Sequence, residues 1–221
     1  MTDNERKQHY NAKGMYVGYD KNHKEREALD YYSTPTEEVT NILNVLQLDL
    51  SEATVLEPSA GGGHMLQGIL DYQIPKKIYA TDIQKRELVD NSLHIEAGKE
   101  FDFLNDDYPY QNDIDYIIMN PPYATIDAFT MRGLGIAQKG VLVLGRLQFL
   151  EGQKRFKSIF NCAPPNEVYI YVERITCHKN GIVQKENSVQ AYAWFYWDLR
   201  NGLSENTNTN LHWIHKVGAK V

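Results

Sequence analysis

The sequence predicts an α/β fold with a doubly wound, mostly parallel seven-stranded sheet that has an antiparallel end. Three observations support this. Short apolar segments alternate with helical patterns over the first two thirds of the chain. A glycine cluster follows the first apolar segment, where doubly wound folds bind ligands. In the last third, apolar segments follow one another without helices, as in antiparallel pairing.

The N-terminal segment differs from the rest of the chain. Residues 1–30 are polar and mixed in charge, and they are expected to form an arm before a single domain over 31–221. Ser33–Glu38 predicts a helix start, because Ser or Thr can cap, Pro fits the first turn and acids favour the positive end of the helix dipole. The apolar face of this helix carries Val39, Ile42, Leu43 and Leu46.

Five strands and the helices between them are expected next. The expected strands are Ala53–Leu56, Lys77–Thr81, Ser92–Glu96, Tyr116–Met119 and Gly140–Leu144. The expected helices are Met65–Tyr72, Ile126–Gln138 and one around Phe149–Phe160.

The antiparallel end is expected from the segments that follow. Glu167–Val172 and Ser188–Trp197 are strands in this interpretation, and Lys179–Gly181 between them is a turn signal. Leu211–Val217 is expected to add an edge strand.

Composition narrows the classes of function. No apolar run approaches the roughly 20 residues of a membrane span, and the N-terminus has no apolar signal core. Cys162 and Cys177 fit no metal-ligand spacing, so we expect no metal and reduced thiols in a cytoplasmic protein. The net charge of −6 argues against strong nucleic-acid binding. A basic run over Arg132–Lys157, which includes Arg146 and Lys154, is either a solvated face or a phosphate-facing surface.

The segment Val55–His64 predicts a ligand-binding loop. Its glycines allow a tight turn and close approach of the backbone to a ligand. A dinucleotide fingerprint would need a third glycine where Leu66 stands, and a phosphate-binding Gly-Lys-Ser/Thr is absent. Glu57 beside the loop would repel a pyrophosphate, whereas it suits a ligand that carries an amino group and a sulfonium.

Two further acidic positions follow at the ends of expected strands or loops. Asp82 ends the second strand, where an acid binds ribose hydroxyls in doubly wound folds. Asp102 and Phe103 come one unit later, where a carboxylate could accept from an adenine amine and a ring could pack on the base. Ligands bind at the carboxyl ends of the strands in such sheets, so these residues should gather with the glycine loop.

The tetrapeptide Asn120-Pro121-Pro122-Tyr123 follows the fourth strand and is the sharpest signal in the chain. Two prolines fix the backbone and leave carbonyl oxygens free to accept, and the Asn side-chain oxygen adds another acceptor. Tyr123 offers a flat face for a planar group. Two acceptors and a stacking face suit an sp² amine whose lone pair is to be turned toward an electrophilic methyl group.

The order of these motifs resembles the adenine-N6 DNA methyltransferases, closest to their gamma-type arrangement. The matching elements are Tyr32-Ser33-Thr34-Pro35, Glu57–Gly63, Asp82, Asp102-Phe103 and Asn120–Tyr123, and the resemblance covers roughly residues 30–200. It implies a Rossmann-like methyltransferase domain over 31–221 that uses S-adenosylmethionine, of the small kind familiar in phages, mobile elements and restriction-modification systems.

The resemblance also implies roles for single residues. S-adenosylmethionine is expected to bind Thr34, Pro35, Glu57, Pro58, Ala60, Gly61, Gly63, Asp82, Ile83, Asp102, Phe103 and Asn120. Catalysis is expected from Asn120, Pro121, Pro122 and Tyr123. Expected substrate contacts are Tyr123, one aromatic residue of Trp194 and Phe195, and the basic side chains Arg146 and Lys154.

The expected partner is DNA, with RNA also possible. Family members that read a sequence carry a separate recognition domain, and only 98 residues (221 − 123) follow Tyr123 here. Methyltransferases acting on RNA base amines or protein glutamine share the tetrapeptide, and a non-catalytic regulatory protein on the same fold is the alternative from a different class. Asn120 favours adenine over cytosine N4, and no Pro-Cys nucleophile for cytosine C5 is present. The sequence indicates no oligomeric state or target sequence.

Overall fold

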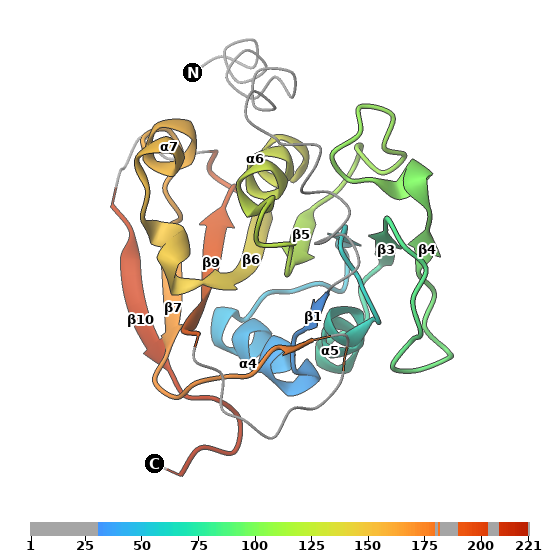
Figure 1. The fold of residues 1–221 in the computed structure, drawn as a ribbon, viewed down its shortest axis with the longest axis horizontal. Coiled ribbons are helices and arrows are strands. Elements are labelled where there is room, and N and C mark those ends of the chain that lie inside the picture. Colours follow the sequence, from blue (N-terminus) through green and yellow to red (C-terminus); the bar gives the residue numbers. More distant parts are fainter. Residues whose placement is uncertain (1–30, 180, 182–189, 203–207, 221) are drawn as a thin grey trace.

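The computed structural model describes residues 31–179, 181, 190–202 and 208–220, so the predicted arm over 1–30 lies outside the described residues. The described chain contains an eight-stranded sheet with helices on both faces, which confirms the predicted doubly wound α/β class (Figure 1). The sheet order is β10-β7-β9-β6-β5-β2-β3-β4. In chain order these strands are β2 (Thr54–Glu57), β3 (Lys77–Asp82), β4 (Glu96–Ala97), β5 (Tyr116–Met119), β6 (Gly140–Arg146), β7 (Glu167–Tyr171), β9 (Tyr192–Asp198) and β10 (Asn210–Ile214).

One reversed strand makes the antiparallel end of the sheet. β9 runs antiparallel to both of its neighbours, β6 and β7, while every other pair in the sheet is parallel. The strand beyond the predicted seven is β10, which lies at the outer edge where Leu211–Val217 was expected to add a strand.

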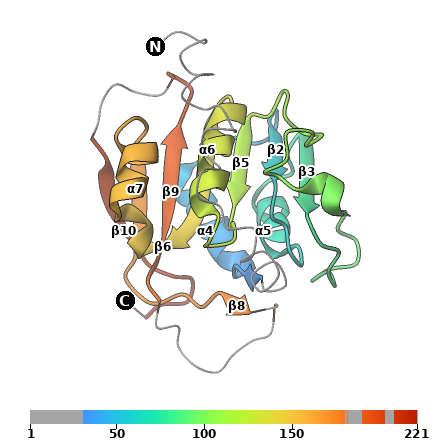
Figure 2. The ribbon, with the colours of Figure 1, turned by 45° about the horizontal axis from the view of Figure 1, so that its top comes forward.

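The two faces of the sheet carry separate apolar cores. Helices α4 (Thr36–Leu46) and α5 (His64–Tyr72) cover one face, and α6 (Ile126–Ile136) with the turns around α7 (Gln153–Arg155) covers the other (Figure 2). Side chains of β6 alternate between the cores, with Leu142 and Leu144 facing α4 while Val141 and Val143 face α6. A fully buried aliphatic side chain contributes about 1.5–3 kcal/mol, so this alternation fixes the strand register.

The contact between α4 and α5 depends on one small residue. A Cβ atom at Gly68 would lie 2.6 Å from Cβ of Val39 and 2.7 Å from the carbonyl oxygen of Thr36. A larger residue would therefore push the two helices apart. The two helices also begin side by side, because the hydroxyl of Thr36 at the start of α4 donates to the carbonyl oxygen of His64 at the start of α5.

The predicted strand Ser92–Glu96 is wrong in extent. β4 contains only Glu96 and Ala97, which pair with Thr81 and Asp82 of β3. Leu93 instead turns inward and lies against the glycine loop, where its Cδ1 atom is 2.8 Å from the position that a Cβ of Gly63 would take. Packing against the loop therefore competes with pairing along β3.

Two helix predictions also need correction. The expected Ser or Thr cap of α4 is absent, because Pro35 holds the cap position and makes no side-chain cap bond. The helix around Phe149–Phe160 is broken into a 3-10 turn (Leu147–Leu150), the short α7 and a π-helical turn (Phe156–Phe160). Gly152, which has φ +116°, separates the first two pieces because that angle is incompatible with a helix.

A second, two-stranded sheet lies beside the main one and was not predicted. β1 (Tyr32–Ser33) pairs antiparallel with β8 (His178–Lys179). In the predicted turn Lys179–Gly181, Asn180 lies outside the described residues, and Gly181 has φ +72° and donates its backbone N–H to the His178 carbonyl.

Among the helices that the structure describes, none has the length and apolar character to cross a membrane.

Candidate active site

A cavity of about 580 Å³ opens where the carboxyl ends of β2, β3, β5 and β6 meet. Most of the residues predicted for the site line it, although they come from distant parts of the sequence. These are Thr34, Glu57, Pro58, Ala60, Asp82, Ile83, Asp102, Phe103, Asn120, Pro121, Pro122, Tyr123 and Arg146. The predicted residues that do not line it are Pro35, Gly61, Gly63, Lys154, Trp194 and Phe195.

Glu57 is a buried acid with an unused oxygen. It ends β2, its side chain is 1% exposed, and its Oε2 atom has no hydrogen-bond partner within the described residues. Burial, reinforced by the charge of Asp82, raises the pKa of Glu57 well above its usual value, and a backbone N–H from Leu66 opposes this rise. A positively charged group in the cavity would supply the partner that this carboxylate lacks.

Asp82 ties the end of β3 to the glycine loop. Its Oδ2 atom accepts the backbone N–H of Gly61 at 2.9 Å, and its Oδ1 atom accepts that of Gln84 at 2.8 Å. Burial raises the pKa of Asp82, and these two N–H groups together with Arg86 oppose the rise. Each carboxylate oxygen keeps a second lone pair, which can accept from a ligand hydroxyl.

The glycine loop is already packed by the protein itself. A Cβ atom at Gly61 would lie 2.7 Å from the ring of Tyr31, and one at Gly62 would lie 2.5 Å from the Tyr31 hydroxyl. The prediction that these glycines make room for a ligand therefore needs correction, since the room next to Gly61 and Gly62 holds the Tyr31 ring. Gly61 and Gly63 also have positive φ, +55° and +87°, which favours glycine at both positions.

The second acidic position is built around a rigid aromatic group. Asp102 accepts the backbone N–H of Leu104 at 3.1 Å. The Phe103 ring is 1% exposed and packs against the rings of Tyr108 and Phe129, with centroids 5.3 and 5.1 Å away. Phe103 therefore forms a fixed wall of the cavity, and the neighbouring Phe101, which the sequence interpretation missed, lines the cavity too.

The side-chain amide of Asn120 has a fixed orientation, because its nitrogen donates hydrogen bonds within the protein. Its Nδ2 atom donates to the carbonyl oxygen of Tyr32 at 2.7 Å and to the hydroxyl of Thr34 at 3.1 Å. A carbonyl oxygen can only accept, so the amide nitrogen must be the atom that faces Tyr32. The Oδ1 atom is thereby left as an acceptor for a ligand. This contact also explains why the Thr34-Pro35 element must lie beside the tetrapeptide.

Tyr123 is held on several sides. Its hydroxyl hydrogen-bonds to that of Tyr192 at 2.9 Å, and the guanidinium of Arg146 lies over its ring, 4.2 Å from the centroid. Burial strongly raises the pKa of Tyr123. Burial likewise raises the pKa of Tyr192 and of Cys177, which hydrogen-bond to each other, to about 12. All three groups are therefore protonated at neutral pH and act as neutral positioning groups.

The prediction that Trp194 or Phe195 of the aromatic strand contacts the substrate needs correction. Trp194 and Phe195 are 0% exposed and belong to the two opposite cores, and the Trp194 indole donates to the Tyr171 hydroxyl at 2.9 Å. The aromatic residue of β9 that reaches Tyr123 is Tyr192, which pairs with Arg146 of β6. Antiparallel pairing places the first residue of β9 opposite the last residue of β6, and this register is the signal that could have identified Tyr192.

The basic run does not form one phosphate-facing surface. Lys139 precedes β6 and pairs with Asp115, whereas Arg146 ends β6 at the cavity. Arg155 is used locally, because it pairs with Asp127 at 2.7 Å and donates to carbonyl oxygens of the preceding turn. Lys154 is exposed and does not line the cavity. Only Arg146 of these four residues lies in the candidate site.

Within the described residues, no group of three or more His, Cys, Asp or Glu side chains could hold a metal ion.

Comparisons with known proteins support the fold. No protein-family model matches the chain, and no curated protein matches its sequence. Among solved structures, a type I restriction-modification system methyltransferase subunit from Streptococcus thermophilus is similar, with a TM-score of 0.58 and 13% identity over 84% of this chain and 47% of the other. A predicted class I S-adenosylmethionine-dependent methyltransferase from Listeria monocytogenes has a TM-score of 0.53 and 11% identity, over 97% and 73% of the two chains.

A third structure matches over nearly the whole of both molecules. A predicted RNA methyltransferase from Pyrococcus horikoshii has a TM-score of 0.56 and 16% identity over 88% of this chain and 98% of the other. In contrast, the chain spans about half the length of the restriction-modification subunit. These likenesses show that the chain has the Rossmann-like fold of S-adenosylmethionine-dependent methyltransferases.

Proposed function

We propose that this chain transfers a methyl group from S-adenosylmethionine to the N6 amine of adenine in DNA. The observation that carries the proposal is the orientation of Asn120, whose amide nitrogen is bound by Tyr32 and Thr34 while its oxygen is left to accept. The gamma-type order of the motifs supports the assignment, because the Thr34-Pro35 element is the part of the chain that fixes this amide.

The residues present fit S-adenosylmethionine as cofactor. The unpartnered Oε2 atom of Glu57 suits a ligand that brings positive charge, and the cofactor carries an ammonium and a sulfonium. Asp82 has lone pairs for a ribose diol, and Asp102 with the Phe103 wall suits an adenine ring. When bound, the cofactor supplies a methyl group that is activated by the positive charge on sulfur.

The chain itself orients the nucleophile. Oδ1 of Asn120 and the carbonyl of Pro121 accept the two hydrogens of an exocyclic amine, which favours a pyramidal nitrogen with its lone pair directed to one side. The carbonyl of Pro122 is not assigned this role, because it already accepts the backbone N–H and the hydroxyl of Thr125. Tyr123 and Arg146 border the same part of the cavity and suit a planar base. No strong base is needed, because the amine proton becomes acidic once nitrogen is alkylated and can leave to water. Positioning thus carries the catalysis.

A base in duplex DNA must leave the stack to reach this cavity. Base flipping costs a few kcal/mol, and the stacking groups in the pocket offset part of that cost. The chain spans only about half the length of the restriction-modification subunit to which it is similar. A role in restriction-modification, of phage or mobile-element origin, belongs to this proposal.

Transfer to an RNA base amine is the second candidate. The end-to-end likeness to the predicted RNA methyltransferase favours it. RNA is recognised largely through single-stranded segments with splayed bases, which need no flipping from a duplex.

Labelling identifies the substrate directly. Wild-type protein is incubated with methyl-labelled S-adenosylmethionine and with unmethylated duplex DNA, single-stranded DNA or RNA, and the labelled polymer is digested to nucleosides for mass spectrometry. We expect N6-methyladenine from DNA. A labelled RNA nucleoside would establish the second candidate instead. Cofactor binding without label in any polymer would contradict both and leave a non-catalytic protein on this fold.

A further inference from the structure

We propose that Arg86, held against Tyr31, binds the α-carboxylate of S-adenosylmethionine. The inference deepens the proposed function and rests on its cofactor. The cofactor carries one anionic group, its α-carboxylate. Three acids already line the cavity, namely Glu57, Asp82 and Asp102. A carboxylate entering this cavity needs a cation beside it to offset repulsion from those acids.

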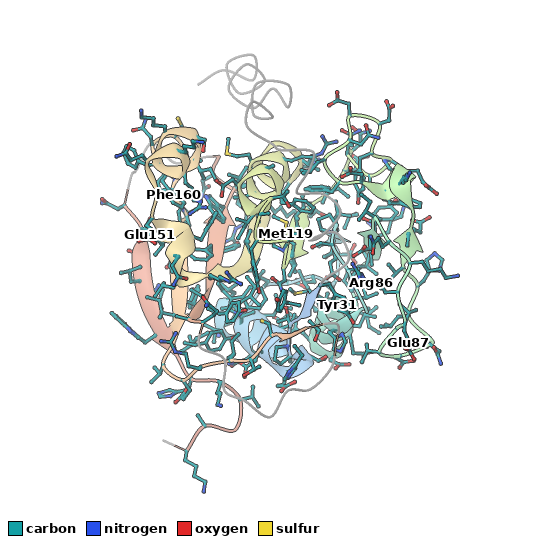
Figure 3. All side chains as sticks on the ribbon, in the orientation of Figure 1. Tyr31, Arg86, Glu87, Met119, Glu151 and Phe160 are labelled. Atoms are coloured by element: carbon teal, nitrogen blue, oxygen red, sulfur yellow. The ribbon has the colours of Figure 1, made fainter. Side chains whose placement is uncertain are left out.

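Arg86 lies on the glycine-loop side of the cavity. Its side chain is 13% exposed, and its Nε atom lies 3.8 Å from Oδ1 of Asp82. Its guanidinium is 4.7 Å from the centroid of the Tyr31 ring, and Figure 3 shows the two labelled residues beside one another. Both residues line the cavity. A planar guanidinium can bind a carboxylate through two parallel hydrogen bonds, which a lysine cannot reproduce.

The start of helix α5 is a second feature that favours a negative charge on this side of the cavity. The glycine loop ends at Gly63, which caps the nine-residue helix α5. The first N–H groups of a helix and its dipole favour anions at that end. Arg86 and the start of α5 therefore provide positive potential on the side where Glu57 and Asp82 provide negative potential, which matches an amino-acid group that carries both charges.

The other cavity-lining arginine in the described chain is placed differently. Arg146 ends β6 and lies over Tyr123 of the tetrapeptide, so it belongs to the part of the cavity assigned to the target base. Arg86 follows β3 and lies beside Asp82, so it belongs to the part assigned to the cofactor. This separation gives each arginine its own ligand.

Tyr31 supports the arginine from the glycine loop. Its ring fills the space next to Gly61 and Gly62, and the guanidinium of Arg86 lies over that ring. A cation over an aromatic face is attracted to it, most strongly when both are partly removed from water. Tyr31 is therefore a positioning residue, because its ring lies between the guanidinium of Arg86 and the glycine loop.

The test compares two ligands that differ only in the group in question. Isothermal titration calorimetry measures binding of S-adenosylmethionine and of decarboxylated S-adenosylmethionine to the full chain. Arg86→Gln should weaken binding of the first by about 10- to 100-fold, as expected for loss of a charge-assisted pair, and should change binding of the second less than about twofold. Lys85→Gln, which removes an exposed neighbouring charge, should change neither.

Two further variants separate binding from folding. Arg86→Lys keeps the charge without the planar group and should give an intermediate loss for S-adenosylmethionine only. Tyr31→Phe should retain most of the affinity because the ring remains, whereas Tyr31→Ala should lose part of it. Circular dichroism checks that each variant is folded.

The outcomes are distinct. The carboxylate assignment would be overturned if Arg86→Gln and Arg86→Lys lowered the affinity for both ligands equally. It would also be overturned if neither variant lowered the affinity for either ligand. Both outcomes would leave the proposed cofactor in place. Wild-type protein that binds neither ligand would overturn the cofactor, and this inference with it.

Discussion

The two halves of the cavity are held together by different kinds of contact. In the cofactor half, at the ends of β2 and β3, Asp82 is fixed by two backbone N–H groups, and Glu57 is sealed inside. In the target half, at the ends of β5 and β6, Tyr123 is fixed by other side chains, namely the Tyr192 hydroxyl and the Arg146 guanidinium. Asp82 therefore depends on the backbone of the neighbouring loop, whereas the position of Tyr123 depends on two other side chains.

This contrast separates binding from transfer. Changes in the cofactor half should weaken cofactor binding, while changes in the target half should lower kcat or raise KM for the nucleic acid and leave cofactor binding largely intact. Three substitutions test that division, and a fourth, Glu57→Gln, tests the buried acid of the cofactor half.

The largest expected effect is on transfer in Asn120→Ala. Loss of the oriented acceptor should lower kcat by about 100-fold or more, in the range seen when one pre-oriented polar group is removed from an active site. Affinity for S-adenosylmethionine should change by less than about threefold. Methyl transfer is followed with labelled cofactor and binding by calorimetry, with the exposed Asn161→Ala as control. Undiminished transfer would remove Asn120 from the catalytic role.

Asp82→Ala should have the next largest effect, on binding. It removes the acceptor for a ribose diol and releases the N–H of Gly61, so the affinity for S-adenosylmethionine should fall by about 10- to 100-fold. The matched control is Asp106→Ala, which changes an exposed acid in the loop after Phe103. Unchanged affinity by calorimetry would contradict the placement of the cofactor at β3.

Glu57→Gln tests a pH dependence. Burial raises the pKa of Glu57 in the folded protein above its unfolded value of roughly 4.3, so the folded state binds a proton more tightly than the unfolded state does. The stability from this group is fully present below that unfolded value and is lost as pH rises toward the folded pKa. The stability of wild-type protein relative to Glu57→Gln should therefore fall as pH rises above the unfolded-state pKa.

Chemical denaturation at several pH values, without cofactor, measures this difference. The exposed Glu37→Gln should track wild-type protein throughout. At neutral pH, saturating S-adenosylmethionine should reduce the stability difference between wild-type protein and Glu57→Gln, because a cationic ligand favours the ionised carboxylate. A stability difference that does not change with pH would show that Glu57 does not titrate as its burial implies.

The smallest expected effect is that of Tyr192→Phe. Loss of one hydroxyl contact to Tyr123 should raise KM for the nucleic acid by roughly twofold to fivefold, with little change in kcat, since one neutral hydrogen bond is worth about 1 kcal/mol. Trp194→Phe on the same strand should instead lower the free energy of unfolding without changing KM. A change in KM from Trp194→Phe, with none from Tyr192→Phe, would reverse our assignment of the aromatic strand.

The sequence predicts the cofactor half better than the target half, for a physical reason. Glu57 and Asp82 end parallel strands, and parallel strands bring their carboxyl ends to one edge whatever their exact register. The contact between Tyr192 and Tyr123 depends on the register between β6 and β9. A shift of one residue would turn every side chain of β9 to the opposite face of the sheet. Strand order can be inferred from a pattern, whereas pairing register also requires the exact ends of both strands, and β9 begins at Tyr192 where the sequence pattern predicts a start at Ser188.

Contacts between loops were the other missed feature. Tyr31 and Arg86 lie 55 positions apart (86 − 31), and no periodicity relates them. The glycine cluster was interpreted as room for a ligand, whereas the Tyr31 ring takes the room next to Gly61 and Gly62. Arg86 comes four residues after Asp82, which is the one local signal that could have drawn attention to it.

The group that orients Asn120 most closely is a main-chain carbonyl, that of Tyr32. Every amino acid at position 32 supplies the same carbonyl, so alanine scanning would pass over the contact. What matters is the number of residues between this carbonyl and Thr34, because the two acceptors must reach one amide nitrogen together. Among related chains we therefore expect insertions and deletions between positions 32 and 35 to be excluded, while the ring at position 32 serves a separate purpose, packing against Tyr123 with centroids 5.5 Å apart.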